Sequence, residues 1–109
     1  MKLMIAGSRS ITDFDLSSYI PDNVDTIISG GAKGIDTLAE QYAIAHKLSR
    51  YIILPNYNRY GKAAPIKRNQ KMVDMADVVL VVWDEKSKGT LSTINYTKKQ
   101  QKQLILITV

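Results

Sequence analysis

Five short apolar runs at regular intervals most constrain how this chain can fold. They lie at residues 3–6, 25–29, 51–54, 78–83 and 104–109. Apolar runs this short, bounded by Gly, Pro or Asp, are typical of buried strands in a parallel sheet, whose two faces are both covered by helices. The segments between them read as helices, at 13–20, 35–48, 65–76 and 90–101. The clearest is 35–48, because its apolar residues recur at the three-and-four spacing of one helix face.

This alternation predicts a single α/β domain over residues 1–109. We expect a Rossmann-like three-layer sandwich of about five parallel strands, with right-handed crossovers and helices on both faces. The 109 residues, 45% of them hydrophobic, suffice for one core. The chain has no cysteine, which excludes disulfides, thiolate catalysis and cysteine-ligated zinc. No apolar run approaches the ~20 residues that cross a bilayer, so we expect a cytoplasmic protein without a membrane partner.

The charge of the chain favours an anionic partner. The formal net charge is +5, and no acidic residue lies between Glu40 and Asp74, a stretch that contains the basic segment 59–71. A local positive field attracts a small phosphate ligand and a nucleic acid alike, so both remain open.

In open parallel sheets a ligand binds beyond the carboxyl ends of the strands, where the strand order reverses. The loop after the first strand contains Gly7, Ser8 and Arg9. Glycine permits close backbone approach, Ser8 offers a hydroxyl, and the Arg9 fork suits a phosphate or a carboxylate. The alternative is an ordinary turn in which Arg9 is solvated.

The loop after the second strand carries three glycines, Gly30, Gly31 and Gly34, together with Lys33 and Asp36. It joins a buried strand to a long helix, so free amides at the helix start can face an anion. The pattern is neither the Walker motif nor the dinucleotide fingerprint. Asp36 either stabilises the helix dipole or accepts hydrogen bonds from ribose hydroxyls.

Two further segments complete the predicted ligand site. Ser87, Gly89 and Thr90 open the last helix, where they either cap it or bind a phosphate oxygen. Asn69 falls in the middle of the apolar face of helix 65–76, so its amide must find a partner in loop backbone or ligand. Arg68 borders that face and is either a solvated charge or able to reach the strand ends.

The sequence assigns no catalytic residue, metal site or cofactor. It has one histidine, no cluster of carboxylates and no Gly-x-Ser-x-Gly elbow. The aromatic residues Tyr57, Tyr60 and Trp83 are candidates for stacking on a base.

Taken in order, these motifs resemble the SLOG superfamily, named for the DprA/Smf DNA-processing proteins and the Lonely Guy enzymes. The closest branch is the small single-domain, YspA-like (cpYpsA-related) one. The resemblance rests on residues 5–9, 29–36, 60–64, 68–69, 76–77, 83 and 87–90. It implies a Rossmann-like domain that binds nucleotides or nucleotide-derived signals at the strand ends. Many members are proposed sensors or effectors in conflict systems of bacteria and phages.

The departures from the enzymatic branch indicate a binder rather than an enzyme. Thr93 stands where the phosphoribohydrolase glutamate would be, and Asn69 replaces a lysine. Losing that carboxylate removes the group suited to act at the ribosyl centre. We therefore expect binding without turnover, and the resemblance implies that the protein senses or sequesters a nucleotide-derived small molecule, such as an ADP-ribose-like signal, in phage or bacterial defence.

Other functions remain open. A nucleotide-processing enzyme, hydrolysing an N-glycosidic or phosphate bond, would use Asp36 or Asp84. A single-stranded DNA binder would use segment 59–71 together with Tyr57 and Tyr60. A homo-oligomer is open as well, while the base, the phosphate number and turnover are not specified by the sequence.

Overall fold

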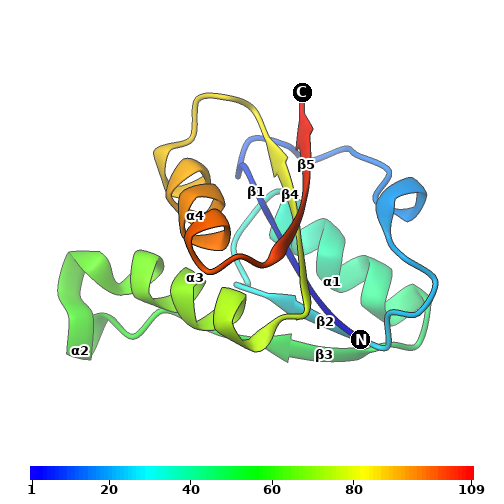
Figure 1. Cartoon of the computed structure of the whole chain (residues 1–109), viewed down its shortest axis with the longest axis horizontal. Helices are drawn as coiled ribbons and strands as arrows, with labels where there is room; N and C mark the ends of the chain where they lie inside the picture. The colour runs from blue at the N-terminus through cyan, green and yellow to red at the C-terminus, as the bar shows by residue number, and fades with distance from the viewer.

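The computed structural model describes residues 1–109 and contains one parallel five-stranded sheet (Figure 1). The strand order is β3-β2-β1-β4-β5, and every neighbouring pair is parallel. The strands are β1 (Lys2–Gly7), β2 (Thr26–Ser29), β3 (Ser49–Ile52), β4 (Val78–Trp83) and β5 (Gln103–Thr108). The chain steps outward from β1 to β3 and then returns to place β4 beside β1. The strand order therefore reverses between β1 and β4, which is where ligands bind in such sheets.

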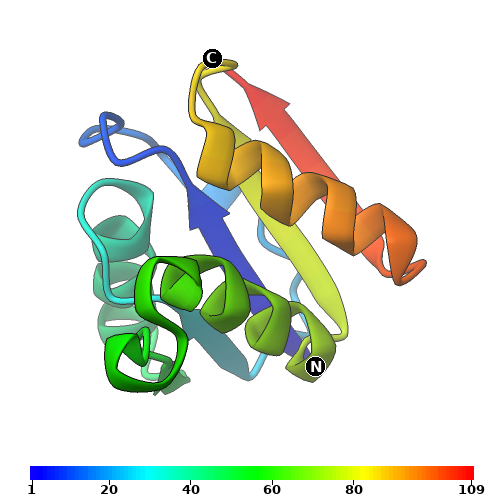
Figure 2. The same cartoon turned by 90° about the vertical axis from the view of Figure 1, so that its left-hand side faces the viewer.

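Helices cover both faces of the sheet, as Figures 1 and 2 show. The three longer helices are α1 (Ile35–Ala45), α3 (Ala64–Met75) and α4 (Lys88–Lys99). Leu3 and Ile5 of β1 pack in the core with α1, whereas Met4 and Ala6 pack in the core with α3 and α4. Both alternate sets of side chains are buried, which explains why the strands are continuous apolar runs. The predicted Rossmann-like α/β sandwich is confirmed.

The predicted helix at 13–20 is wrong. The segment contains only the 3-10 turn η1 (Ser17–Tyr19). The Asp15 carboxylate accepts hydrogen bonds from the backbone N–H and from the hydroxyl of Ser17. Such local bonds compete with helical backbone bonds, and Pro21 prevents the helix from extending.

Other boundaries also differ from the prediction: α1 ends at Ala45 and not at 48, and α4 spans 88–99 and not 90–101. Segment 56–64, which lies between the predicted strand 51–54 and the predicted helix 65–76, holds the short helix α2 (Tyr57–Tyr60) and the 3-10 turn η2 (Gly61–Ala63). The Asn56 side chain caps α2 by accepting a hydrogen bond from the Arg59 N–H at 3.2 Å. β3 begins at Ser49 rather than at 51, because an edge strand does not need to be apolar throughout. None of the helices combines the length and the apolar character needed to span a membrane.

Candidate functional site

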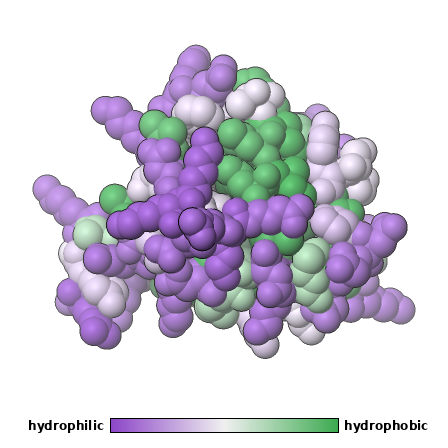
Figure 3. All heavy atoms as spheres, in the orientation of Figure 1, coloured by the Kyte–Doolittle hydropathy of each residue, from purple (hydrophilic) through white to green (hydrophobic).

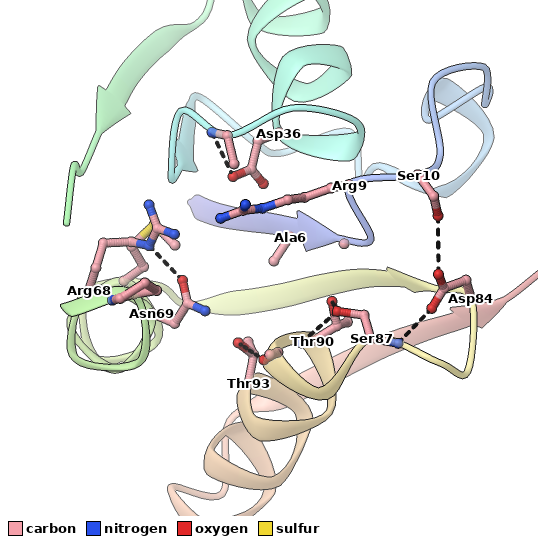
Figure 4. Close-up of a pocket in the computed structure, with 15 residues that line it drawn as sticks. Ala6, Arg9, Ser10, Asp36, Arg68, Asn69, Asp84, Ser87, Thr90 and Thr93 are labelled. Carbon is pink, nitrogen blue, oxygen red and sulfur yellow. Dashed lines mark hydrogen bonds between the residues drawn. The ribbon is translucent and has the colours of Figure 1, made fainter. Parts of the chain in front are cut away.

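A polar cavity of about 280 Å³ lies at the carboxyl ends of β1 and β4 (Figure 4). The start of α3, the start of α4 and the loops after β1 and β2 enclose it. Its volume is just below the range of ~300–1,000 Å³ that is common for small-molecule sites. Only 3 of the 15 residues that line it are hydrophobic, so the cavity is suited to a polar ligand.

Arg68 of α3 lines one side of the cavity and is only 8% exposed (Figure 4). Its Nη1 donates hydrogen bonds to the carbonyl oxygens of Gly30 at 2.6 Å and Ile53 at 3.3 Å. Its Nε donates to Oδ1 of Asn69 at 2.7 Å, which gives the predicted buried amide its partner. Arg68 is therefore not the solvated surface charge that its position at the border of the helix face allowed.

Two features leave the charge of Arg68 incompletely compensated. No carboxylate oxygen lies within 4.0 Å of the Arg68 guanidinium; the one ion pair of the chain is between the amino group of Met1 and Asp25. Its second terminal nitrogen, Nη2, has no hydrogen-bond acceptor in the protein. Burial lowers the pKa of Arg68, and the nearby Asp36 carboxylate opposes that shift. An arginine nevertheless remains a cation in a protein.

Gly30 makes room for the Arg68 side chain. A Cβ atom at this position would lie 2.6 Å from Nη1 of Arg68 and 2.9 Å from Oδ2 of Asp36. The φ angle of Gly30 is not in the left-handed region, so the requirement for glycine is steric. Glycine at position 30 therefore leaves the space that the Arg68 guanidinium occupies.

Asp36 lies in the first turn of α1, lines the cavity and is 7% exposed. Its Oδ2 accepts a hydrogen bond from the Ala32 N–H at 3.1 Å, which holds the glycine-rich loop against the helix. Burial raises the pKa of Asp36, while the Ala32 hydrogen bond and the Arg68 charge oppose the rise. Oδ1 accepts no hydrogen bond from the protein and is free for a hydroxyl donor.

The start of α4 forms the opposite wall of the cavity. Ser87 is its N-cap, and the Ser87 hydroxyl oxygen accepts hydrogen bonds from the N–H of Thr90 at 3.3 Å and from its hydroxyl at 3.0 Å. Gly89 lies in the first turn, and no atom would come within 4 Å of a Cβ placed there. The first turn of α4 is thus open to a ligand, with the positive end of the helix dipole behind it.

Asp84 joins the loop after β4 to the loop after β1 by hydrogen bonds. Its Oδ1 accepts hydrogen bonds from the N–H groups of Lys86 and Ser87, both at 2.9 Å, and its Oδ2 accepts one from the Ser10 hydroxyl at 3.1 Å. The Ser8 hydroxyl oxygen accepts from the Asp84 N–H at 3.0 Å. The bonds from Ser87 and Lys86 lower the pKa of Asp84 to about 2. Asp84 is therefore ionised at neutral pH and already bonded on both oxygens.

The structure brings eight of the thirteen predicted ligand-site residues together around the cavity: Gly7, Arg9, Asp36, Arg68, Asn69, Ser87, Gly89 and Thr90. The other five lie outside its lining. Ser8 is buried against Asp84, and Gly30 lies against Arg68. Gly34 has a φ of 74°, and a Cβ there would lie 2.5 Å from the Ser8 carbonyl oxygen. Gly31 and Lys33 are exposed beyond the cavity.

Three polar residues of the cavity were not among the predicted ligand-site residues: Ser10, Asp84 and Thr93. Asp84 directly follows a strand and lies three residues before a helix cap, a spacing at which aspartate often organises a turn. Thr93 is 2% exposed and donates to the Gly89 carbonyl oxygen at 3.3 Å. Thr93 lies one turn after Thr90 on the same helix face, and this spacing could have identified it as a residue of the site.

The cavity can bind an anion at Arg68 and at the start of α4, and hydroxyl groups at Asp36. No group of three or more His, Asp or Glu side chains is placed to hold a metal ion. Among the aromatic candidates, Tyr57 and Tyr60 are exposed outside the cavity lining, and Nε1 of Trp83 donates to the Ser87 carbonyl oxygen at 3.0 Å. Comparison with protein-family models, curated proteins and solved structures finds no match to this chain.

Proposed function

We propose that the protein binds a nucleotide or nucleotide-derived ligand in this cavity and acts by sensing or sequestering it. The observation that carries the proposal is the buried guanidinium of Arg68, which has no carboxylate within 4.0 Å and a free Nη2 at the cavity. A buried charge is costly unless it is paired and hydrogen-bonded. A phosphate supplies both the countercharge that Arg68 lacks and an acceptor oxygen for its Nη2.

The other walls of the cavity fit the remaining parts of a nucleotide. Free amides in the first turn of α4 suit a second phosphate oxygen or phosphate group, and Gly89 allows close approach. The free Oδ1 of Asp36 suits a ribose hydroxyl. The resemblance of the motifs to the SLOG superfamily points to the same ligand class, with an ADP-ribose-like signal as one candidate and a role in phage or bacterial defence.

Binding without turnover is better supported than hydrolysis. Thr93, a neutral hydroxyl, lines the cavity. In the motifs of the hydrolases that this sequence resembles, a glutamate stands at this sequence position. Asp84 has a pKa of about 2 and is bonded on both oxygens, so it is a poor general base or acid near neutral pH. An enzymatic alternative would rest on Asp36, the cavity carboxyl whose pKa is raised.

The test is a thermal-shift panel of mononucleotides, dinucleotides, ADP-ribose derivatives, cyclic nucleotides and short single-stranded DNA, at low and high salt. A ligand at about 100 times its Kd adds roughly 2.7 kcal/mol of stability. For a domain of this size that corresponds to a rise in Tm of roughly 10 °C. We expect a small-molecule shift that survives high salt, with the ligand recovered intact by chromatography.

Arg68→Gln is the variant that tests the site. It removes the charge but keeps a donor near the Gly30 carbonyl, and it should abolish the ligand-dependent shift. Lys67→Gln makes the same charge change at the exposed neighbouring residue and should leave the shift intact. An unchanged affinity of Arg68→Gln would refute the proposal. A shift that appears only with DNA, grows with oligonucleotide length and falls steeply with salt would favour the nucleic-acid alternative. Turnover that Asp36→Asn abolishes would favour the enzyme.

A further inference from the structure

β5 is an edge strand that is apolar on both sides. Leu106 is 39% exposed, and Val109, directly after the strand, is 58% exposed. Ile105 and Ile107 pack partly against the core on the α1 side, and Leu104 packs partly against the core on the side of α3 and α4. Figure 3 shows hydrophobic atoms gathered over β5, with hydrophilic atoms around them. Residues 103–109 have no charged side chain, in a chain whose formal net charge is +5.

The opposite edge of the sheet is different. β3 has four residues, includes Arg50, and has Nζ of Lys2 5.9 Å from the ring centre of Tyr51. Charged side chains on an edge strand discourage pairing with another chain. β3 is therefore short and protected, whereas β5 has six residues and lacks such protection.

The unpaired backbone groups of β5 follow from its pairing with β4. The Val109 N–H donates to the Trp83 carbonyl at 3.0 Å, so the backbone groups of Val109 and of every second residue before it point toward β4. The N–H and C=O groups of Leu104, Leu106 and Thr108 consequently point away from the sheet. These three residues offer a row of donors and acceptors that the chain itself does not use.

We propose that two copies of this chain form a dimer by antiparallel pairing of their β5 strands, with a two-fold axis at Leu106. In this register Leu106 pairs with its own copy and Leu104 with the partner's Thr108. The outward groups then form about six hydrogen bonds between the strands. Ile105 lies opposite the partner's Ile107 as a non-hydrogen-bonded pair, in which side chains approach most closely. The two sheets become one sheet of ten strands.

A second copy fits this edge better than a charged partner does. An interface with two-fold symmetry must be self-complementary. The pairing of β5 meets this condition, because the side chains opposite each other are uncharged on both strands. About six direct hydrogen bonds fall within the range of a typical protein interface. A contact limited to one strand and its flanking side chains lies at the small end of specific interfaces, so the dimer should depend on protein concentration.

Sedimentation equilibrium from ~1 µM to ~1 mM protein tests the proposal over the affinity range of weak and moderate complexes. The wild type should reach twice the mass of one chain within this range. Leu106→Lys should remain monomeric, because two ammonium groups would be opposed at the axis. Ile44→Lys, an equivalent change at a 60% exposed residue of α1, should dimerise like the wild type. Circular dichroism melts establish that both variants are folded.

Mixing separates this register from nonspecific association. Leu106→Glu alone should also be monomeric, but mixed with Leu106→Lys it should form a one-to-one heterodimer, because residue 106 faces residue 106 only when the axis lies there. A wild type that is monomeric at every concentration overturns the proposal. Dimers of Leu106→Lys, loss of the dimer in Ile44→Lys, or failure of the mixture to pair would overturn it equally.

Discussion

Gly30→Ala tests the packing that places Arg68 in the cavity. The new Cβ would lie 2.6 Å from Nη1 and 2.8 Å from Cζ of Arg68, well inside van der Waals contact. Alanine is compatible with the backbone here, because the φ angle of Gly30 is not in the left-handed region. The cost of the substitution therefore comes from displacing the guanidinium and not from strain in the backbone.

The magnitude follows from the hydrogen bonds that this displacement breaks. Nη1 of Arg68 donates to the Gly30 carbonyl at 2.6 Å and to the Ile53 carbonyl at 3.3 Å. A hydrogen bond to a charged group contributes about 1.5–3 kcal/mol. Since the shorter bond is the stronger, we expect Gly30→Ala to lower the free energy of unfolding by about 2–3 kcal/mol. The Tm should fall by roughly 10 °C, and ligand-dependent stabilisation should be lost as well.

Urea denaturation followed by Trp83 fluorescence measures this change. Gly89→Ala is the matched control, because no atom lies within 4 Å of its Cβ position in α4. It should be neutral or stabilising by up to about 1 kcal/mol. Combining Gly30→Ala with Arg68→Ala tests the cause, because the penalty of Gly30→Ala should shrink by more than half once Arg68 is truncated. Full stability of Gly30→Ala, or an undiminished penalty in the double variant, would refute this reasoning.

Two predictions concern pH. The Asp84 pKa of about 2 lies below its ordinary value of 3.8, so the stabilisation from this carboxylate is present above pH 3.8 and is lost as the pH falls toward 2. Asp84→Asn should flatten the fall of the urea midpoint in that window; an unchanged slope would contradict the assignment. The pKa of Asp36 is raised above 3.8, so ionisation of Asp36 lowers stability as the pH rises from 3.8 through its folded-state pKa. Asp36→Asn can still accept the Ala32 hydrogen bond and should be at least as stable as the wild type at pH 7; a clear loss of stability there would show that the ionised carboxylate is favourable.

Much of the fold could be predicted because strand burial is visible in the sequence. Runs such as 78–83 are apolar throughout, which is typical of strands in a sheet covered on both faces. Gly and Pro mark the ends of several of these runs. The helix at 13–20 was wrongly predicted because its apolar pattern is weak. The hydrogen bonds from Ser17 to the Asp15 carboxylate compete there with helical backbone bonds, and the apolar pattern does not show them.

The candidate site was predictable where it depends on chain order. Loops at the carboxyl ends of parallel strands must meet at one edge of the sheet. The loop that contains Arg9, and the helix starts that contain Asp36 and Ser87, could therefore be assigned to one region before the strand order was known. Which residues line the cavity was less predictable. A glycine that makes room for a neighbour, such as Gly30, has the same sequence signature as one that lets a ligand approach.

The sequence by itself determined the number of strands, their places along the chain and their parallel direction, because each strand depends on the hydrophobicity of its own residues and each crossover on the helix between two strands. Only the tertiary structure decided the role of Arg68. Its position on a helix wheel allowed a solvated charge, yet its side chain reaches the carbonyl of Gly30, 38 residues away in the sequence. That contact exists because β2 and β3 are neighbours in the sheet, and the first half of α3 lies close enough to their carboxyl ends for Arg68 to reach the carbonyls of both Gly30 and Ile53. The energy of burying a charge depends on the groups around it, which are distant in the sequence and cannot be identified from the residues next to Arg68 in the chain.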